Sequence, residues 1–293
     1  MNAATQDGAA AMDRHLRHNA TRDPARSRTG KRIVALPVPS GPERDTLQLR
    51  VYRALASGLK AGMFKPGEAV TLRTLATRLG TSAMPVRQAV SRLIAERALV
   101  LLPNRSVIVP RMSRARFSEL SQARQLLEGL ATEAAGARAT PALLRQLAEI
   151  NEAMKRSIEL KDLHGALSHN MAFHFTLYRS AGQQIVLPLI EMLWLQAGPF
   201  LALSLSTPGV RWTARHHQAA LAALRAGDGP TAGRAIEADI EETTRQLLKR
   251  AVFADEPEAI AAARNGRDLH LSPLAGRGRI ARLRAIRVRG ALR

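Results

Sequence analysis

The chain of 293 residues contains no cysteine, and aromatic side chains make up only 3% of it. Without cysteine the protein can form neither disulfides, nor thiolate metal sites, nor iron–sulfur clusters, and it has no thiol nucleophile. Nothing in the composition points to an oxidising compartment. Any metal or catalytic chemistry must therefore come from histidine, carboxylate, amide and basic side chains.

Acidic residues are nearly absent from one segment. Residues 46–114 contain 12 Lys or Arg but only Glu68 and Glu96, so this segment carries half of the net charge of +20. A localised basic region is typical of proteins that bind polyanions such as DNA. Only Tyr52 and Phe64 are available there to stack on bases, which disfavours single-stranded RNA as the partner.

Long hydrophobic runs are also scarce. The first forty residues are rich in arginine and lack an apolar core, so they do not resemble a signal peptide. Residues 192–210 are uncharged and approach the length of a membrane span, but Gln196 and Pro199 interrupt them. We interpret this stretch as a buried helix and expect a cytoplasmic protein with no membrane contact. Segments 1–44 and 254–293 are basic and aperiodic, and we expect both to be disordered tails.

The basic segment has the pattern of three short helices followed by a hairpin. Apolar residues recur at helical spacing from about residue 46, again after Thr71, and again after Ser82, and both of these hydroxyl residues are placed to cap a helix. Two apolar runs, 99–102 and 107–109, flank a Pro-Asn-Arg-Ser turn. This order predicts a winged helix-turn-helix over residues 45–112, whose third helix would lie in the DNA major groove.

Several polar side chains of this segment are candidates for contact with DNA. Arginine can fork onto guanine edges or phosphates, and a hydroxyl at a helix start can hold a phosphate. The alternatives are a solvated basic surface or a winged helix that binds protein, but a segment with only two acidic residues favours DNA. The candidates are Arg73, Ser82, Arg87, Arg92, Asn104 and Arg105.

The run from Gly62 to Pro110 closely resembles the N-terminal domain of GntR-family bacterial repressors. Its PG turn and its LA..LG, S..PVR.A and PNR elements fall in the family's order. The resemblance implies that Arg73, Ser82 and Arg87 contact the operator and that the wing around residues 104–105 approaches the minor groove.

The segment departs from the family pattern at three positions. Ala83 stands where the family usually has a base-reading arginine, so we expect a different operator preference. Arg97 and Ser106 occupy positions usually held by glycine. Arg97 would be strained if the end of the third helix requires a positive φ.

From residue 113 to 253 the pattern becomes helical, and the short connections predict an antiparallel bundle. The expected fold is therefore mostly α: an N-terminal winged helix-turn-helix and a C-terminal all-helical domain for effector binding and dimerisation. The predicted helices of this second domain are 115–137, 141–160, 163–181, 184–205, 210–225 and 230–252.

Residues 115–253 resemble the ligand-binding domain of FadR-type regulators, called FCD, through QARQLLEGLATEAA, N..FH and HQAALAALRAGD. That domain commonly holds a metal ion, and the resemblance implies Asn170, His174, His217 and Asp239 as ligands. Asp239 replaces a usual third histidine, so zinc, manganese and nickel all remain open.

Other interpretations of these histidines also remain open. His174 and His217 can instead be hydrogen-bonded interior histidines of a pocket without metal. His216 and Glu242 are the substitute ligands if the predicted helix phase is wrong by one turn. His164 and His169 fit neither spacing and are expected at the surface.

Arg124 matches a family position that can face the pocket. A guanidinium beside a cation would bind a small carboxylate at two points, so the resemblance implies an organic or sugar acid as effector. The alternative is an ion pair between Arg124 and Glu128 on a solvated helix face, which would contribute little.

Together these features predict a sequence-specific transcriptional regulator, a repressor, that binds a palindromic operator as a homodimer and responds to a small carboxylate. We expect no enzyme, because HExxH, G-x-S-x-G, P-loop and dinucleotide motifs are all missing. The alternatives are a metal-dependent helical-bundle hydrolase and a sequence-independent, nucleoid-type DNA binder that uses the Arg-rich tail.

Overall fold

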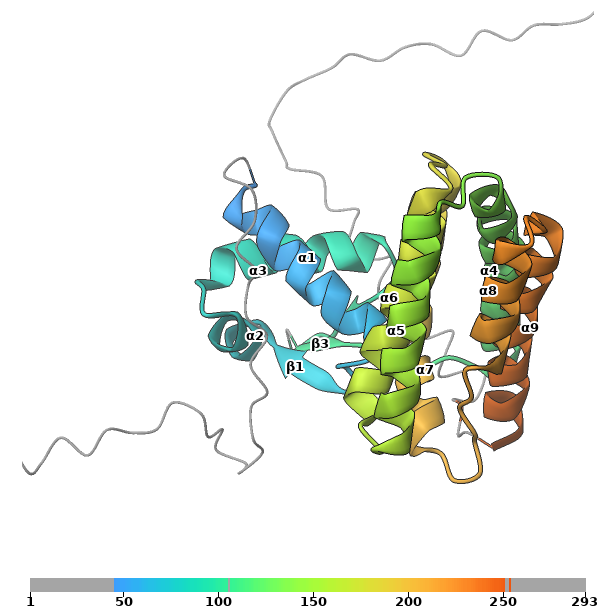
Figure 1. Ribbon diagram of the computed structural model, residues 1–293. Helices are drawn as coiled ribbons and strands as arrows, with labels where there is room; N and C mark the ends of the chain where they lie inside the picture. The colour runs from blue at the N-terminus through green and yellow to red at the C-terminus, as the bar shows by residue number, and fades with distance from the viewer. Residues whose placement is uncertain (1–44, 105, 251–252, 254–293) are drawn as a thin grey trace, which may run out of the picture.

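The computed structural model describes residues 45–104, 106–250 and 253. The two predicted tails and Arg105 lie outside these residues. The described chain is mostly helical, as the sequence predicts, and it consists of a small head with a three-stranded sheet beside an all-helical bundle (Figure 1).

The head contains three helices and three short strands. Thr46 and Thr71 cap α1 and α2 through their side-chain oxygens, which accept hydrogen bonds from the backbone N–H groups of Leu49 and Thr74. Gly80 ends α2 in the left-handed conformation, at φ 62°. The elements are α1 (Leu47–Lys60), β1 (Ala69–Thr71), α2 (Leu72–Leu79), α3 (Ala83–Ala95), β2 (Val100–Leu101) and β3 (Ser106–Ile108).

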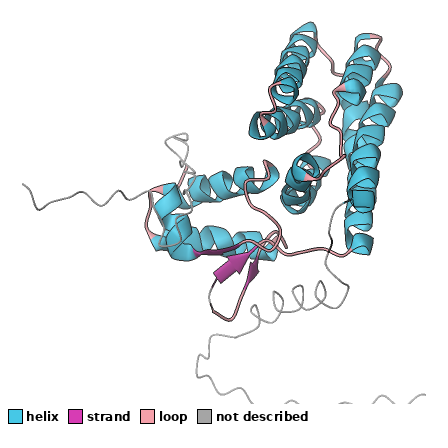
Figure 2. Ribbon diagram, turned by 90° about the horizontal axis from the view of Figure 1, so that it is seen from below, coloured by secondary structure: helices cyan, strands magenta, loops and turns pink. Residues whose placement is uncertain are grey.

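The predicted hairpin is confirmed as β2 and β3, but the sheet has a third strand that the sequence did not indicate. The strand order is β1-β3-β2, and β1 pairs antiparallel with β3 with Val70 opposite Val107. The sheet closes the head below its helices (Figure 2). Because β1 runs directly into α2, this pairing fixes α2 relative to the wing.

The bundle begins immediately after the head. α4 and α9 pack along their lengths, and their glycines allow this close approach: a Cβ on Gly136 would lie 2.6 Å from the Cα of Gly229. The predicted start of α8 near residue 210 is wrong. Residues 207–214 form a loop, tied down by hydrogen bonds from Arg211 N to Gln246 and from Trp212 Nε1 to Ser204. The helices are α4 (Arg114–Gly136), α5 (Pro141–Glu159), α6 (Leu163–Ser180), α7 (Val186–Ser206), α8 (Arg215–Arg225) and α9 (Gly229–Arg250).

Helix α7 connects the two parts of the molecule. Its Trp194 and Ile190 lie in the core of the bundle. Its Leu195 belongs to the core of the head, where α7 packs against α1. Among the described residues, only α7 contains a segment, Val186–Ser204, long and apolar enough to cross a membrane. The burial of these three side chains against other helices agrees with the interpretation of this stretch as a core helix.

Candidate functional site

The exposed side of α3 carries some of the predicted DNA contacts. Arg87 lies on its exposed side, away from the buried Val86 and Val90, and Arg73 is exposed on α2. Ser82 is the N-cap residue of α3, but its side chain makes no capping hydrogen bond, so the predicted side-chain cap is wrong. The Ser82 hydroxyl is exposed and can still accept or donate to a ligand.

Arg92 and Asn104, two further head candidates, have partners within the protein. Arg92 donates to Glu96 at 2.9 Å and lies over the ring of Tyr52, with its guanidinium carbon 3.7 Å from the ring centre. The Asn104 side-chain oxygen accepts from the backbone N–H of Ser106, which shapes the wing turn. Arg105 lies outside the described residues.

A pocket in the bundle encloses about 530 Å³ of empty space, part of it open to solvent. His174 and Asn170, one helical turn apart on α6, line it, and Asp239 lines it from α9. Arg211 lies at the pocket on the loop 207–214, so the loop that replaces the predicted start of α8 forms part of the wall.

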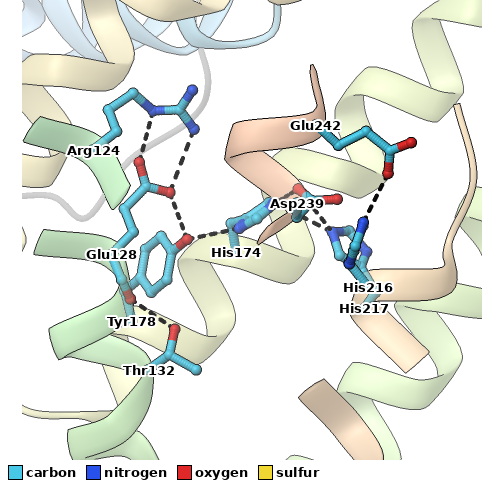
Figure 3. Close-up of polar contacts among 9 residues, drawn as sticks. All are labelled: Arg124, Glu128, Thr132, His174, Tyr178, His216, His217, Asp239 and Glu242. Atoms are coloured by element: carbon cyan, nitrogen blue, oxygen red, sulfur yellow. Dashed lines mark hydrogen bonds and ion pairs between the residues drawn. The ribbon is translucent and has the colours of Figure 1, made fainter. Parts of the chain in front are cut away.

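Three ligand atoms converge at this pocket, from His174, His217 and Asp239, which we call the His–Asp cluster (Figure 3). The two Nε2 atoms are 3.2 Å apart, and Asp239 Oδ2 lies 3.5 Å from His174 Nε2 and 3.9 Å from His217 Nε2. Ligands about 2.1 Å from one ion, in tetrahedral or octahedral geometry, lie roughly 3.0–3.4 Å apart. The three residues therefore fit a single divalent cation with little movement.

The protonation states also suit a cation. Burial lowers the pKa of His217 to about 3 although Asp239 opposes this, so the imidazole is neutral. Burial acts to raise the pKa of Asp239, but its contact with His174 and the other nearby histidines lower it to about 2. A neutral imidazole, as at His217, and an ionised carboxylate, as at Asp239, are the forms that bind metals.

Arg124 and Glu128 form the predicted ion pair, but in the protein interior and not on a solvated face. Arg124 Nε donates to Glu128 Oε1 at 2.7 Å, and the two side chains are 5% and 0% exposed. Arg124 also lines the pocket and lies over the ring of Trp194. Arg124 thus forms the ion pair that was the alternative interpretation, and it also faces the pocket.

Comparison with known proteins agrees with this architecture. Residues 47–109 match the family described as "Bacterial regulatory proteins, gntR family", and residues 119–242 match the family "FCD domain". The chain is 31% identical over 186 residues to the HTH-type transcriptional regulator McbR of Escherichia coli K12, an alignment that covers 62% of this chain and 84% of McbR.

The chain belongs to the GntR family of bacterial regulatory proteins and carries an FCD domain. It is similar to the HTH-type transcriptional repressor RspR of E. coli K12, with 26% identity over 68% of this chain and 89% of RspR. The solved structure of E. coli McbR/YncC superposes with a TM-score of 0.64 at 29% identity, covering 70% of this chain and 98% of that one.

These relatives are transcriptional regulators, which confirms the prediction that this GntR-family protein is a regulator and not an enzyme. A regulator from Rhodococcus sp. RHA1 shares the fold, with a TM-score of 0.56 at 22% identity over 69% of this chain and 97% of that one.

The structure brings together most of the predicted pocket residues. His174, His217 and Asp239 form the cluster, and Asn170 lies buried in the same pocket wall. The substitute ligands His216 and Glu242 also line the pocket but form a separate group. Glu242 accepts hydrogen bonds from His216 and from Arg215, at 2.7 Å in each case.

Two details of the bundle differ from the predictions. His164 is exposed as expected, but His169 is only partly exposed and bonds to Ser157. Tyr178 was not predicted at all, although it bonds directly to His174. Its position one helical turn after His174 is the only signal in the sequence, and a tyrosine at that spacing more often belongs to a core.

Proposed function

We propose that this regulator is a repressor that binds a palindromic operator as a homodimer, with one α3 helix in the major groove of each half-site. The observation that carries the proposal is the exposed surface of α3, where Arg87 and the unbonded Ser82 hydroxyl lie on a head with strong positive charge. Arg73 on α2 and Asn104 in the wing flank this surface, and Arg92 borders it. A helix N-terminus in this setting positions phosphate and base contacts.

The homodimer is supported by exposed apolar side chains on two helices that pack together. Leu126 and Leu130 on α4 are 73% and 48% exposed, and Leu189 and Met192 on α7 are 40% and 38% exposed. Exposed apolar side chains gathered on neighbouring helices are typical of protein interfaces. A two-fold dimer formed through α4 and α7 would provide two heads, each of which binds one half-site of the operator.

The pocket would hold a divalent cation, zinc, manganese or nickel, through His174, His217 and Asp239, with Asn170 as a fourth ligand. The bound cation would supply a positive centre for a small carboxylate effector. Arg124 and the exposed Arg211 are the basic side chains of the pocket. Because Arg124 already pairs with Glu128, Arg211 is the guanidinium more available to the effector. Binding would shift the protein between operator-bound and released states. We place this regulator in the cytoplasm, where its DNA lies.

The DNA proposal is tested by selecting an operator from genomic fragments with the full chain and then measuring its affinity against random duplex over a range of salt. We expect a specificity ratio of at least roughly 10³ for the operator. Arg87→Ala should remove this preference, whereas Arg145→Ala, which deletes an exposed arginine of α5, should preserve it. Equal affinity for operator and random DNA would instead indicate a nucleoid-type binder.

The pocket proposal is tested by metal analysis of the purified protein and of His174→Ala. We expect about one divalent ion per chain in the wild type and a large loss in the variant. Thermal-shift assays with small carboxylates, with and without metal, then identify the effector class. Wild-type protein that binds no divalent ion would refute the metal site.

A further inference from the structure

A line of buried polar side chains runs from α4 to the His–Asp cluster (Figure 3). Arg124 donates to Glu128, the Tyr178 hydroxyl donates to Glu128 Oε2 at 2.6 Å, and His174 Nδ1 lies 2.7 Å from the Tyr178 oxygen. None of these four side chains is more than 5% exposed. Water therefore does not compete for their hydrogen bonds, and each proton in the line has a defined position.

The direction of every bond follows from the single proton on the Tyr178 hydroxyl. Glu128 pairs with Arg124, so it is an ionised carboxylate, and an ionised carboxylate can only accept hydrogen bonds. Tyr178 must then give its one proton to Glu128. Its oxygen can only accept from His174, which fixes a proton on His174 Nδ1. In the neutral ring Nε2 then carries the lone pair, which faces His217 Nε2 at 3.2 Å.

We propose that Glu128 and Tyr178 are positioning residues that hold His174 as the Nδ1–H tautomer, with its unprotonated Nε2 directed at the His–Asp cluster. The role of His174 as a metal ligand rests on the proposed function, whereas the hydrogen bonds that set its tautomer do not depend on a metal. A ligand histidine whose second nitrogen is hydrogen-bonded is oriented before the ion arrives, and loss of such a partner typically weakens metal binding 10–100-fold.

The second histidine of the cluster lacks this support. His217 Nδ1 is buried and has no hydrogen-bond partner among the described residues. Its ring stacks on Phe173, with ring centres 4.1 Å apart and planes 4° apart, and its Nε2 contacts only the cluster itself, 3.2 Å from His174 Nε2. His174 is therefore the ligand that hydrogen bonding orients, and the Tyr178 hydroxyl should control the affinity of the whole cluster.

The hydrogen-bonded line from Arg124 to His174, which we call the relay, is tested first without metal. Nitrogen-15 NMR of histidine-labelled apo protein distinguishes the two imidazole tautomers. In the wild type His174 should carry its proton on Nδ1. In Tyr178→Phe the Nδ1 partner is lost, and Asp239 at 3.5 Å from Nε2 should draw the proton to Nε2. Tyr52→Phe is the matched control, because it removes the chain's other tyrosine hydroxyl, also bonded to a glutamate, from the head.

Glu128→Gln tests the same relay by a different route. Its amide oxygen should stay on Arg124, which turns the amide NH₂ toward Tyr178, so Tyr178 becomes free to donate to His174. This substitution should also move the His174 proton to Nε2. Because a buried Arg124 loses its partner charge, thermal unfolding is recorded for each variant to confirm that it is folded.

Zinc titration of the apo proteins completes the test. We expect Tyr178→Phe to bind zinc 10–100-fold more weakly than wild type, with Tyr52→Phe unchanged. An Nδ1–H tautomer that persists in folded Tyr178→Phe, or an unchanged zinc affinity in that variant, would overturn the relay. Absence of zinc binding by wild type would overturn the metal proposal, and the NMR result on apo protein would still decide whether Tyr178 sets the tautomer.

Discussion

Gly198 of α7 lies directly against Lys60 at the end of α1: a Cβ built on Gly198 would be 2.7 Å from the Lys60 Cα. The same Cβ would also meet the backbone oxygen of Leu59. Around this crossing, the Lys60 ammonium lies over the ring of Phe175, 4.7 Å from its centre. Phe175 directly follows the cluster residue His174, and the ring of Trp194 on α7 contacts both of them, at 5.1 Å and 5.3 Å between ring centres.

Gly198→Ala should therefore loosen the head from the bundle. The added methyl meets main-chain atoms that cannot rotate away, and overpacking of this kind costs about 1–3 kcal/mol. Hydrogen exchange should become faster at the C-terminal end of α1. Gln146→Ala, at an exposed position of α5, is the control and should leave this exchange unchanged. If hydrogen exchange in Gly198→Ala is as slow as in the wild type, α1 and α7 can accommodate the methyl group without loosening, which would contradict this prediction.

Arg97 has a φ of 59°, so the strain considered from the sequence is present at the end of α3. The left-handed region costs a residue with a side chain roughly 1–2 kcal/mol, a penalty that glycine avoids. Arg97→Gly should raise the free energy of unfolding of the head by about 1 kcal/mol in urea titrations. Arg97→Ala removes the same charge but keeps the strain, and it should give no such gain. An equal gain in both variants would attribute the effect to charge.

Met84 should read thymine in the operator. It lies in the first turn of α3, 65% exposed, next to Ala83, so apolar surface replaces the guanidinium usual for the family. Apolar side chains contact the thymine methyl group. Replacing one operator thymine by deoxyuridine should weaken wild-type binding roughly fourfold, the equivalent of about 0.8 kcal/mol for one methyl. Met84→Ala should not respond to that replacement. Wild-type affinity that is indifferent to deoxyuridine at every position would contradict this role.

Glu242 should contribute to stability only above acidic pH. Burial acts to raise its pKa, but hydrogen bonds from His216 and Arg215 lower it below its ordinary 4.5. The folded state thus favours the ionised carboxylate, and the stabilisation is present above pH 4.5 and lost as pH falls through the lowered pKa.

Glu242→Gln should accordingly cost about 0.5–1 kcal/mol at pH 7, the usual size for such a pair. Thermal unfolding at several pH values should show the difference from wild type shrinking below pH 4.5. Glu119→Gln, at an exposed position of α4, serves as the reference substitution. A difference that stays constant through the acid range would rule out ionisation as its source.

The helices were predictable because their signals are local. Thr71 precedes an apolar repeat and caps α2 as predicted, and Thr46 caps α1 in the same way at the predicted start of the first helix. Strand β1 was missed because three residues carry no periodicity, and only pairing with β3, more than thirty residues away, makes them a strand. The start of α8 was misplaced for a similar reason, since Arg211 and Trp212 bond to α9 and α7 instead of continuing a helix.

The sequence by itself determined the basic head, the order of its helices and the residue types of the cluster, because charge, apolar spacing and family motifs are properties of the chain. Only the tertiary structure decided that the pair of Arg124 and Glu128 is buried and that Tyr178 joins this pair to His174. The direction of a hydrogen bond depends on which partner still has a proton to give. That is known only when residues fifty positions apart, such as Glu128 and Tyr178, are seen in contact.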